Sequence, residues 1–347
     1  MVKLNPKVVV WEYTLKCNSK CIHCGSDCGA DSARLREDEL SLPECINLVG
    51  QIADVGFQRV ILSGGEPTLR KDWPKTAERI NEKGMEFGII SNALHWDNGT
   101  IDRLVSLKPF SVGFSVDGEQ ETHDYLRGVV GSHKKVFDSI RELKRKGAVV
   151  CAVTSVSKKN IDELIKMRNR LIVYEVDAWQ IQMASPMGRM KQNMDIVLDE
   201  DDYQKLGSFI STSRQKLQYM NISAGDCMGY FGKLEHGLRD SDWDGCKAGI
   251  ETLGIESDGN IKGCLSIQAK KAAEGNIRNR QLREIWEDEK LFRYTRDFSP
   301  EDLKGKCRGC EYGAKCKGGC SSQSSAFFDE YHHAPYCFFR YEVKNGN

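Results

Sequence analysis

The sequence has no long hydrophobic run, no excess of one charge and no export signal. No segment of the 347-residue chain approaches the roughly 18 to 20 apolar residues that cross a membrane. Its first ten residues contain neither a long apolar core nor a small-residue cleavage site, so we expect a cytoplasmic protein. The 50 basic and 50 acidic residues cancel, which leaves no overall field to attract nucleic acid or an anionic membrane. We therefore expect neither as a partner.

Cysteine, by contrast, is abundant, with 14 in the chain. Because the cytosol keeps thiols reduced, these cysteines favour metal ligation over disulfides. Cys17, Cys21 and Cys24 follow an apolar run with the spacing C-x3-C-x2-C. Three thiolates on one short loop suit three corners of a cubane iron-sulfur cluster and leave one iron open for chemistry. A zinc site completed by Cys28 or His23 is the alternative that this spacing leaves open.

The first two-thirds of the chain alternate short β-branched runs with longer amphipathic segments, which indicates strand-helix units around a parallel sheet. We predict six strands, at residues 8–13, 59–63, 86–91, 111–116, 149–155 and 178–183. Helices are predicted at residues 43–54, 73–83, 101–107, 133–146, 161–170 and 200–216. The expected N-caps are Ser41, Asp72, Ser132, Asn160 and Asp199, and the expected helix stops are Gly84 and Gly147. Six right-handed units form an α/β fold, a partial (β/α)6 barrel of TIM type that is too short to close.

Polar motifs follow several of these strands, and chemistry in such barrels lies at the C-terminal strand ends. In chain order they are Gly64-Gly65-Glu66-Pro67, Ser91-Asn92, Ser115 with Asp117, and Arg127. The glycines allow close backbone approach, and the oxygens can accept hydrogen bonds from an ammonium group. Together the motifs suit a zwitterionic amino acid and a ribose. Taken alone, the Gly-Gly-Glu-Pro run also fits an ordinary strand-to-helix turn.

The cysteine tripod after the first strand and Gly-Gly-Glu-Pro after the second together resemble the radical S-adenosylmethionine (SAM) superfamily. The resemblance implies that the tripod binds a 4Fe-4S cluster whose open iron is chelated by the amine and carboxylate of SAM. It also implies cleavage of SAM to a 5′-deoxyadenosyl radical that abstracts hydrogen from a substrate. The implied SAM contacts are His23 near the adenine, Gly64, Gly65, Glu66 and Pro67 at the methionyl amine, and Ser91, Asn92, Ser115, Asp117 and Arg127 around the carboxylate and ribose.

A second field of cysteines begins at residue 246 and is similar to the SPASM extension, which carries two auxiliary 4Fe-4S clusters. The chain would then hold three clusters, with residues 1–225 as the barrel and residues 226–347 as the SPASM domain. The resemblance implies that the distal cluster uses Cys307, Cys310, Cys316 and Cys337, and that the nearer one uses Cys246, Cys264 and Cys320. The fourth ligand of the nearer cluster is either Cys227 or a substrate thiolate. Without the resemblance, a zinc-ribbon-like tail also fits these thiolates.

The resemblance implies a peptide-modifying enzyme that forms a thioether or carbon-carbon crosslink in a ribosomally made precursor peptide. Sulfatase maturases of this architecture carry an aspartate after the cysteine that corresponds to Cys264, but this chain has Leu265 there. Sixteen residues precede Cys17, too few for a leader-binding domain, so we expect a separate leader-recognition protein or another surface of the enzyme to do that work. A reductant such as flavodoxin or ferredoxin is the other expected partner.

Other activities stay open. In an epimerase, a thiol such as Cys28, Cys151 or Cys227 would return a hydrogen atom to the substrate. Sulfatase-maturase-like oxidation and dehydrogenation of a small molecule use the same cofactors. A non-enzymatic electron carrier would not need the Gly-Gly-Glu-Pro motif. Cys45 and Cys151 lie outside all motifs and are expected to be small buried hydrophobic residues.

Overall fold

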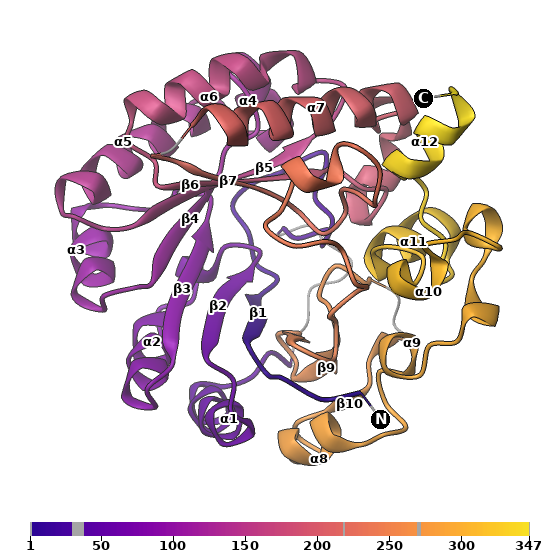
Figure 1. The fold of residues 1–347 in the computed structure, drawn as a ribbon. Helices are drawn as coiled ribbons and strands as arrows, with labels where there is room; N and C mark the ends of the chain where they lie inside the picture. Colours follow the sequence, from indigo (N-terminus) through magenta and orange to yellow (C-terminus); the bar gives the residue numbers. More distant parts are fainter. Residues whose placement is uncertain (1, 30–37, 218, 269–271, 347) are drawn as a thin grey trace.

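The computed structural model describes residues 2–29, 38–217, 219–268 and 272–346 (Figure 1). Within these residues one sheet of ten strands runs in the order β10-β9-β8-β1-β2-β3-β4-β5-β6-β7. All neighbours from β8 through β1 to β7 are parallel, and β9 and β10 extend the sheet in antiparallel fashion. The strands that end the sheet, β7 and β10, are not neighbours, so the curved sheet is an open barrel.

The six predicted strands are all present, each within one residue of its predicted ends. They are β1 Val8–Thr14, β2 Arg59–Gly64, β3 Glu86–Ser91, β4 Ser111–Ser115, β5 Val150–Val156 and β6 Ala178–Met183. Four strands escaped prediction because they have two to four residues each: β7 Asn221–Ala224, β8 Thr252–Ile255, β9 Asn260–Lys262 and β10 Gly275–Asn276. Since β8 pairs with β1, the sheet continues into the segment predicted as the second domain.

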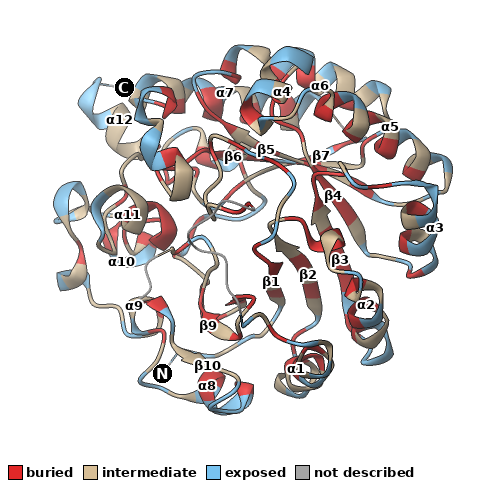
Figure 2. Cartoon of the chain, turned by 180° about the vertical axis from the view of Figure 1, so that it is seen from behind, coloured by how far each residue is buried: buried red, intermediate tan, exposed pale blue. Residues whose placement is uncertain are grey.

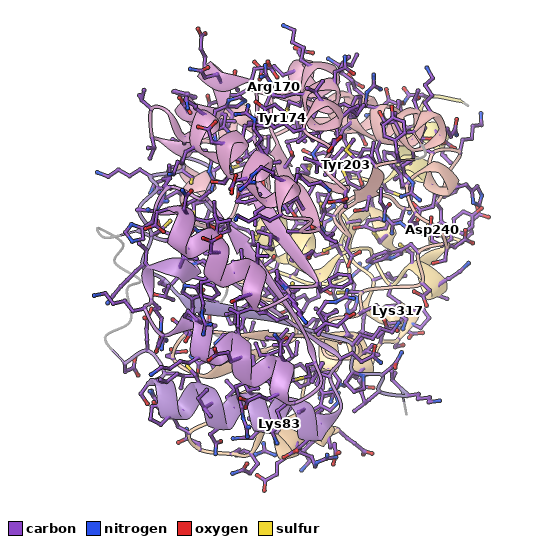
Figure 3. All side chains as sticks on the ribbon, turned by 90° about the vertical axis from the view of Figure 1, so that its left-hand side faces the viewer. Lys83, Arg170, Tyr174, Tyr203, Asp240 and Lys317 are labelled. Carbon is purple, nitrogen blue, oxygen red and sulfur yellow. The ribbon has the colours of Figure 1, made fainter. Side chains whose placement is uncertain are left out.

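Helices cover the outer face of the parallel strands, as Figure 1 shows. The predicted ones are α1 Leu42–Val55, α2 Trp73–Glu82, α3 Asn98–Ser106, α5 Ser132–Arg145, α6 Leu164–Val173 preceded by the 3-10 turn η2 Ile161–Glu163, and α7 Glu200–Lys216. One helix in this region was missed, α4 Gln120–Arg127, which buries only His123 and Leu126 and so has little apolar periodicity. Figure 3 shows the helical layer face on, with Lys83 near one end and Arg170 and Tyr174 near the other.

Helix ends follow the expected capping chemistry with one exception. Ser41, Asp72, Asn160 and Asp199 are N-caps as predicted, and Gly84 and Gly147 follow helices with φ of 74° and 76°. Ser132 is not the N-cap of α5, because Gly131 occupies that position. Asp124 explains the difference: its carboxylate accepts hydrogen bonds from the Ser132 hydroxyl and the His133 amide, both at 2.8 Å, and so serves the helix start from outside.

The C-terminal segment is built from short pieces. Its helices are α8 Leu282–Glu287, α9 Arg293–Arg296, α10 Gly313–Cys316, α11 Ser321–Phe328 and α12 Phe338–Lys344, with 3-10 turns that include η5 Glu235–Gly237, η7 Pro300–Asp302 and η8 Gly305–Cys307. Helix α8 joins the outer layer beside α1, where the Leu282 amide donates to Gln51 Oε1 at 2.7 Å. The remaining pieces lie beside the strands in Figure 1, in orange and yellow.

The main core lies between the sheet and the helices, and burial is concentrated on the strands (Figure 2). Trp11 and Tyr13 of β1 are almost completely buried. Cys45 is also fully buried, as expected, whereas Cys151 on β5 is only half-buried. Among the described residues, no helix is both long and apolar enough to cross a membrane.

Candidate iron-sulfur and SAM site

The N-terminal cysteine loop, defined here as residues 17–28, leaves the C-terminal end of β1 and is tied to its neighbours through the backbone. The amides of Lys20 and Ile22 donate to the carbonyls of Arg127 and Leu126 at 3.1 and 3.0 Å. Cys21 and Cys28 are buried, while Cys17 and Cys24 are half-buried. Helix α4, which the sequence did not predict, therefore packs against this loop and accepts two of its backbone hydrogen bonds.

The glycine pair after β2 holds the chain that enters the cysteine loop. The Gly65 amide donates to Thr14 O at 2.7 Å, and the Glu66 amide donates to Lys16 O at 2.8 Å. A Cβ atom at Gly65 would overlap the Lys16 carbonyl, and one at Gly64, whose φ is 124°, would overlap the Thr14 carbonyl. Glycine is therefore required here by close approach of two backbones.

Glu66 is completely buried and its carboxylate is committed to the fold. It accepts hydrogen bonds from the amides of Thr68 at 3.2 Å and Asn92 at 2.8 Å, and from the Ser91 hydroxyl at 2.9 Å. Burial raises the pKa of Glu66, and these hydrogen bonds oppose the rise. Pro67 begins the 3-10 turn η1 Pro67–Leu69, which Glu66 caps. The motif thus joins β2 to β3 as well as to the cysteine loop.

Asn92 reaches from the end of β3 into the cysteine loop. Its Nδ2 donates to Asn18 Oδ1 at 2.8 Å and to Ser19 Oγ at 3.0 Å, and it lies 3.7 Å from Cys17 Sγ. The side chain therefore orients the start of the tripod. Ser115 is the last residue of β4, so it lies at the C-terminal edge of the sheet, two residues before Asp117.

Asp117 links the cysteine loop to helix α4 and strand β5. Its Oδ2 lies 3.2 Å from His23 Nε2 and 3.1 Å from Arg127 Nη1, and its Oδ1 accepts the Ser155 amide at 2.9 Å. Burial alone would raise the pKa of Asp117, but His23 and Arg127 outweigh it and hold the pKa below its usual range. The His23 Nδ1 atom is buried without a hydrogen-bond partner among the described residues. This leaves a polar position open beside the tripod, which fits a bound ligand.

Four C-terminal cysteines line one small cavity. Cys307, Cys310, Cys316 and Cys337 surround it together with aromatic side chains that include Tyr230, Phe231 and Tyr312. Burial raises the pKa of Cys316 and Cys337, and the neighbouring thiols raise it further. Thiols in such an apolar cavity become good ligands only when a metal takes their protons.

A second group joins Cys246, Cys264 and Cys320 with Cys227. Cys246 and Cys264 both act electrostatically on Cys320, and so does Cys227. Burial raises the pKa of Cys227 and Cys264 to about 11. The Sγ atom of Cys227 accepts the Met183 amide at 3.4 Å, which places it at the end of β6. The charges of Cys246, Cys264 and Cys227 thus all act on Cys320, and their grouping as ligands of one cluster stays a prediction.

The predicted donor sets consist of cysteine thiols alone. Among the described residues, no three His, Cys, Asp or Glu side chains converge as the ligands of one metal ion do. Zinc would hold all its thiolates about 2.3 Å from one centre. Donor sets made of sulfur alone, such as the four cysteines that line one cavity, are the ligands that iron-sulfur clusters use.

Two polar side chains that the sequence did not indicate as site residues follow strands β6 and β7. Arg189, on the 3-10 turn η3 Gly188–Gln192 after β6, binds carbonyls of the cysteine loop. Asp226 follows β7, and its carboxylate has no hydrogen bond or ion pair in the described part of the chain. It is accessible to solvent, yet surrounding protein desolvates it and raises its pKa. Arg189 follows a predicted strand, so its place after a strand end could have marked it as a site residue. Asp226 follows β7, and because that strand was not predicted, its place after a strand end could not be seen in the sequence.

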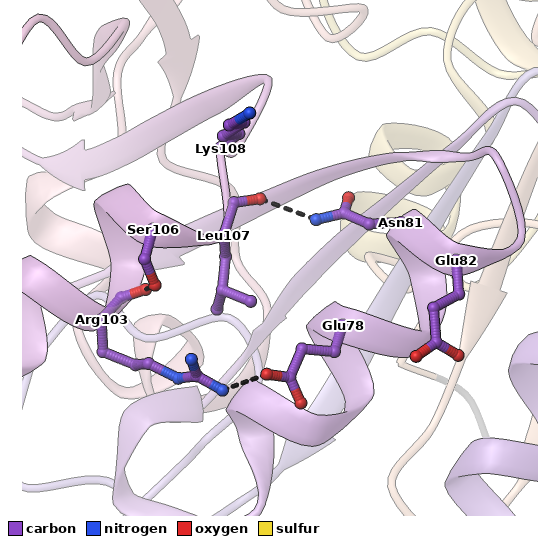
Figure 4. A pocket seen from close by; sticks show the side chains of 7 residues that line it. All are labelled: Glu78, Asn81, Glu82, Arg103, Ser106, Leu107 and Lys108. Atoms are coloured by element: carbon purple, nitrogen blue, oxygen red, sulfur yellow. Dashed lines mark hydrogen bonds and ion pairs between the residues drawn. The ribbon is translucent and has the colours of Figure 1, made fainter.

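A surface pocket between α2 and α3 lies elsewhere (Figure 4). It lies near the C-terminal ends of both helices, which lead into the starts of the next strands, so it is at the opposite edge of the sheet from the cysteine loop. Two of its interactions are internal: Arg103 pairs with Glu78, and Asn81 Nδ2 donates to Leu107 O at 2.7 Å. This pocket shares no residue with the candidate site.

The open barrel with its thiol groups defines an iron-sulfur enzyme. Residues 11–171 match the Radical SAM superfamily, and residues 246–311 match the iron-sulfur cluster-binding domain called SPASM. The chain is therefore a radical SAM enzyme with a C-terminal SPASM domain. These domains imply 4Fe-4S clusters and SAM as cofactors.

Relatives with different substrates share this architecture. The AdoMet-dependent heme synthase of Methanosarcina barkeri is 29% identical over 352 residues, which cover 96% of this chain and 97% of the relative. The PqqA peptide cyclase of Granulibacter bethesdensis is 22% identical, with 92% and 84% covered. Streptococcus suis SuiB bound to S-adenosylmethionine has a TM-score of 0.74 at 20% identity, with 92% of this chain and 73% of SuiB covered. The structure of SuiB bound to precursor peptide SuiA also has a TM-score of 0.74, at 18% identity, and the match covers 96% of this chain and 76% of SuiB.

Proposed function

We propose that this enzyme abstracts a hydrogen atom from a residue of a ribosomally made peptide and forms a thioether or carbon-carbon crosslink. The observation that carries the radical chemistry is the convergence of the cysteine loop, the glycine pair and the Asp117-centred hydrogen bonds at one end of the barrel. When bound there, SAM and a 4Fe-4S cluster supply a 5′-deoxyadenosyl radical.

Within this proposal, the chain's residues hold three clusters and SAM. Cys17, Cys21 and Cys24 ligate the cluster that binds SAM. Backbone oxygens of the motif from Gly64 to Pro67 face the methionyl amine, because the Glu66 carboxylate is already occupied. His23 would offer its unpartnered Nδ1 to the ligand, while Asp117, which is itself paired with Arg127, holds the ring at Nε2.

The auxiliary clusters would belong to a SPASM domain that spans residues 226–347. Cys307, Cys310, Cys316 and Cys337 hold the distal one, as supported by the cavity that they share. Cys246, Cys264 and Cys320 hold the nearer one. Cys227, whose charge acts on Cys320, is the candidate for the fourth ligand of this nearer cluster.

A peptide substrate is supported by the similarity to the PqqA peptide cyclase and to SuiB, whose structure contains its precursor peptide. Coupling a carbon radical to a thiol or a second carbon releases one proton and one electron overall, and an auxiliary cluster of the SPASM domain would accept the electron. The Asp226 carboxylate, on which Arg239 and Lys247 act only through their charges, would accept a hydrogen bond from the reacting group. A leader-recognition protein and a flavodoxin or ferredoxin would complete the system.

A second candidate is haem synthesis, with a tetrapyrrole as substrate. It is favoured by the heme synthase of Methanosarcina barkeri, which aligns over almost the whole length of both chains. The two candidates use the same radical and differ in the group that is presented to it. Epimerisation and sulfatase-maturase-like oxidation are further variants of the peptide proposal.

The test begins with anaerobic reconstitution, iron counting and SAM cleavage with dithionite. Three cubane clusters correspond to about twelve irons per chain. A peptide encoded beside the gene and an iron porphyrin are then added separately, and 5′-deoxyadenosine and product masses are compared. A peptide that loses two hydrogens supports crosslinking. A peptide that keeps its mass in ordinary water but takes up one deuterium when the reaction is run in heavy water indicates epimerisation. A modified porphyrin with an unaltered peptide would replace the peptide proposal by the haem one.

A further inference from the structure

The segment after β6 contacts the cysteine loop through one arginine. Arg189 Nε donates to Cys21 O at 2.8 Å, and Nη1 donates to Cys28 O at 2.6 Å. The same Nη1 pairs with Asp27 Oδ1 at 2.9 Å. One guanidinium therefore binds three residues of the cysteine loop, from a position 168 residues away in sequence from Cys21.

The backbone of this segment is packed equally closely. The Arg189 amide donates to Cys24 O at 3.0 Å, and Asn193 Nδ2 donates to Ile22 O at 3.1 Å. A Cβ atom on Gly188, whose φ is 52°, would overlap the Cys24 carbonyl. The turn thus binds the backbone carbonyls of two residues of the tripod, Cys21 and Cys24.

The other end of the segment reaches the second group of cysteines. The Met183 amide donates to Cys227 Sγ at 3.4 Å. The side-chain Nε2 of Gln323, on α11 three residues after Cys320, donates to the Ser185 hydroxyl. Residues 183–193 therefore contact both the cysteine loop and the elements that carry Cys227 and Cys320.

We propose that Arg189 is a positioning residue that sets the direction of Cys21 and Cys24, and through them the place of the open iron relative to substrate on the SPASM side. This inference rests on the proposed function. Outer contacts that orient ligands matter nearly as much as the ligands themselves. Arg189 provides charge-assisted hydrogen bonds from a rigid planar group, which a lysine cannot reproduce at two carbonyls.

The test compares Arg189→Met and Arg189→Lys with Arg214→Met. Arg214 is a matched control: its side chain is 20% exposed against 24% for Arg189, and it also binds a carbonyl, of Ile222, and a carboxylate, of Asp240. Asp240 is labelled in Figure 3, on the outer side of the molecule. All variants are reconstituted anaerobically and compared at equal iron content.

We expect Arg189→Met to lower 5′-deoxyadenosine formation about 10- to 100-fold, as small misplacements do, and to weaken the change that SAM causes in the electron paramagnetic resonance spectrum of the reduced cluster. Arg189→Lys should recover part of both effects, and Arg214→Met should change neither. If Arg189→Met matches Arg214→Met in rate and spectrum at full iron content, the inference is wrong.

A readout without clusters separates this inference from the proposed function. In metal-free protein, alkylation of Cys21 and Cys24 is followed by peptide mass spectrometry. Arg189→Met should speed their alkylation several-fold relative to Arg214→Met. If the wild type cleaves no SAM, the proposed function fails, and the alkylation experiment alone tests the role of Arg189. Equal alkylation rates of Cys21 and Cys24 in Arg189→Met and Arg214→Met would then overturn that role.

Discussion

The two thiol-rich regions of this enzyme are held in different ways. The N-terminal cysteine loop is fixed by contacts from distant elements: Asn92 after β3, Arg127 on α4 and Arg189 after β6. The C-terminal cysteines lie on or beside short turns and helices such as η8 and α10, which have three and four residues. Aromatic rings pack around them, with Phe231 and Tyr312 stacked at 4.3 Å.

This difference indicates two relationships between metal and fold. The cysteine loop is held by a barrel that has its own hydrophobic core, so the fold positions the loop before any cofactor binds. Helices of four residues are far too short to be stable alone. The C-terminal turns have only a small hydrophobic cluster of their own, so bound clusters would contribute directly to the folding free energy of this region.

The largest effect should come from replacing Cys17, Cys21 and Cys24 by alanine. We expect 5′-deoxyadenosine formation to fall more than about 1,000-fold, because the SAM-binding cluster is lost with its chemistry. Iron content should drop by about four per chain while the C-terminal clusters stay. The barrel should remain folded by circular dichroism. Cys151→Ala, outside every motif, is the control and should retain full activity.

Replacing Cys307 and Cys310 by alanine tests the other half of the comparison. We expect the C-terminal segment to open and to be cut by protease at least about tenfold faster, because proteolysis follows the population of the open form. Cleavage sites mapped by mass spectrometry should fall after residue 300, with the barrel intact. Equal protease resistance in this variant and the tripod variant would remove the contrast between the two regions.

Asp117→Asn should destabilise the barrel by about 3 kcal/mol, since it leaves the Arg127 guanidinium buried beside a neutral amide. Urea denaturation measures this free energy of unfolding. Asp138→Asn is the matched surface control: its ion pairs with Lys134 and Arg141 are exposed, and its loss should cost less than about 1 kcal/mol.

The same aspartate has a definite pH dependence. Because the folded pKa of Asp117 lies below that of an unfolded aspartate, about 3.9, its ionised form stabilises the fold fully above about pH 5. This contribution shrinks as the pH falls toward the folded pKa. The stability difference between wild type and Asp117→Asn should therefore narrow from pH 6 to pH 3; a constant difference would contradict the assignment.

The smallest expected effects concern two glycines. Gly65→Ala forces apart the backbones of the cysteine loop and the β2 end, which should cost about 2 kcal/mol and lower iron retention. Gly50→Ala, in α1, meets no atom within 4 Å and should stabilise the protein by about 0.5 to 1 kcal/mol. Thermal unfolding of the metal-loaded variants measures both. A Gly65→Ala protein as stable as wild type would show that the loop can move away.

Much of the fold could be predicted because its strands and helices are long and regular. Strands such as Glu86–Ser91 match their predicted bounds, and the Asp199 cap of α7 was read from local chemistry. Prediction failed where a strand was too short to show periodicity, or where a residue outside the element caps it. β7 and β8 have four residues each, and the start of α5 is capped by Asp124 instead of Ser132.

The sequence by itself determined the cysteine spacings, the six main strands and the two glycines after β2, because these depend on periodicity and spacing along the chain. Only the tertiary structure decided that Asp117 binds His23 from 94 residues away, that Arg189 binds Cys21 from 168 away, and that β8 adjoins β1. Such contacts depend on the register and curvature of the whole sheet. Those are settled by packing between distant segments, which local patterns do not encode.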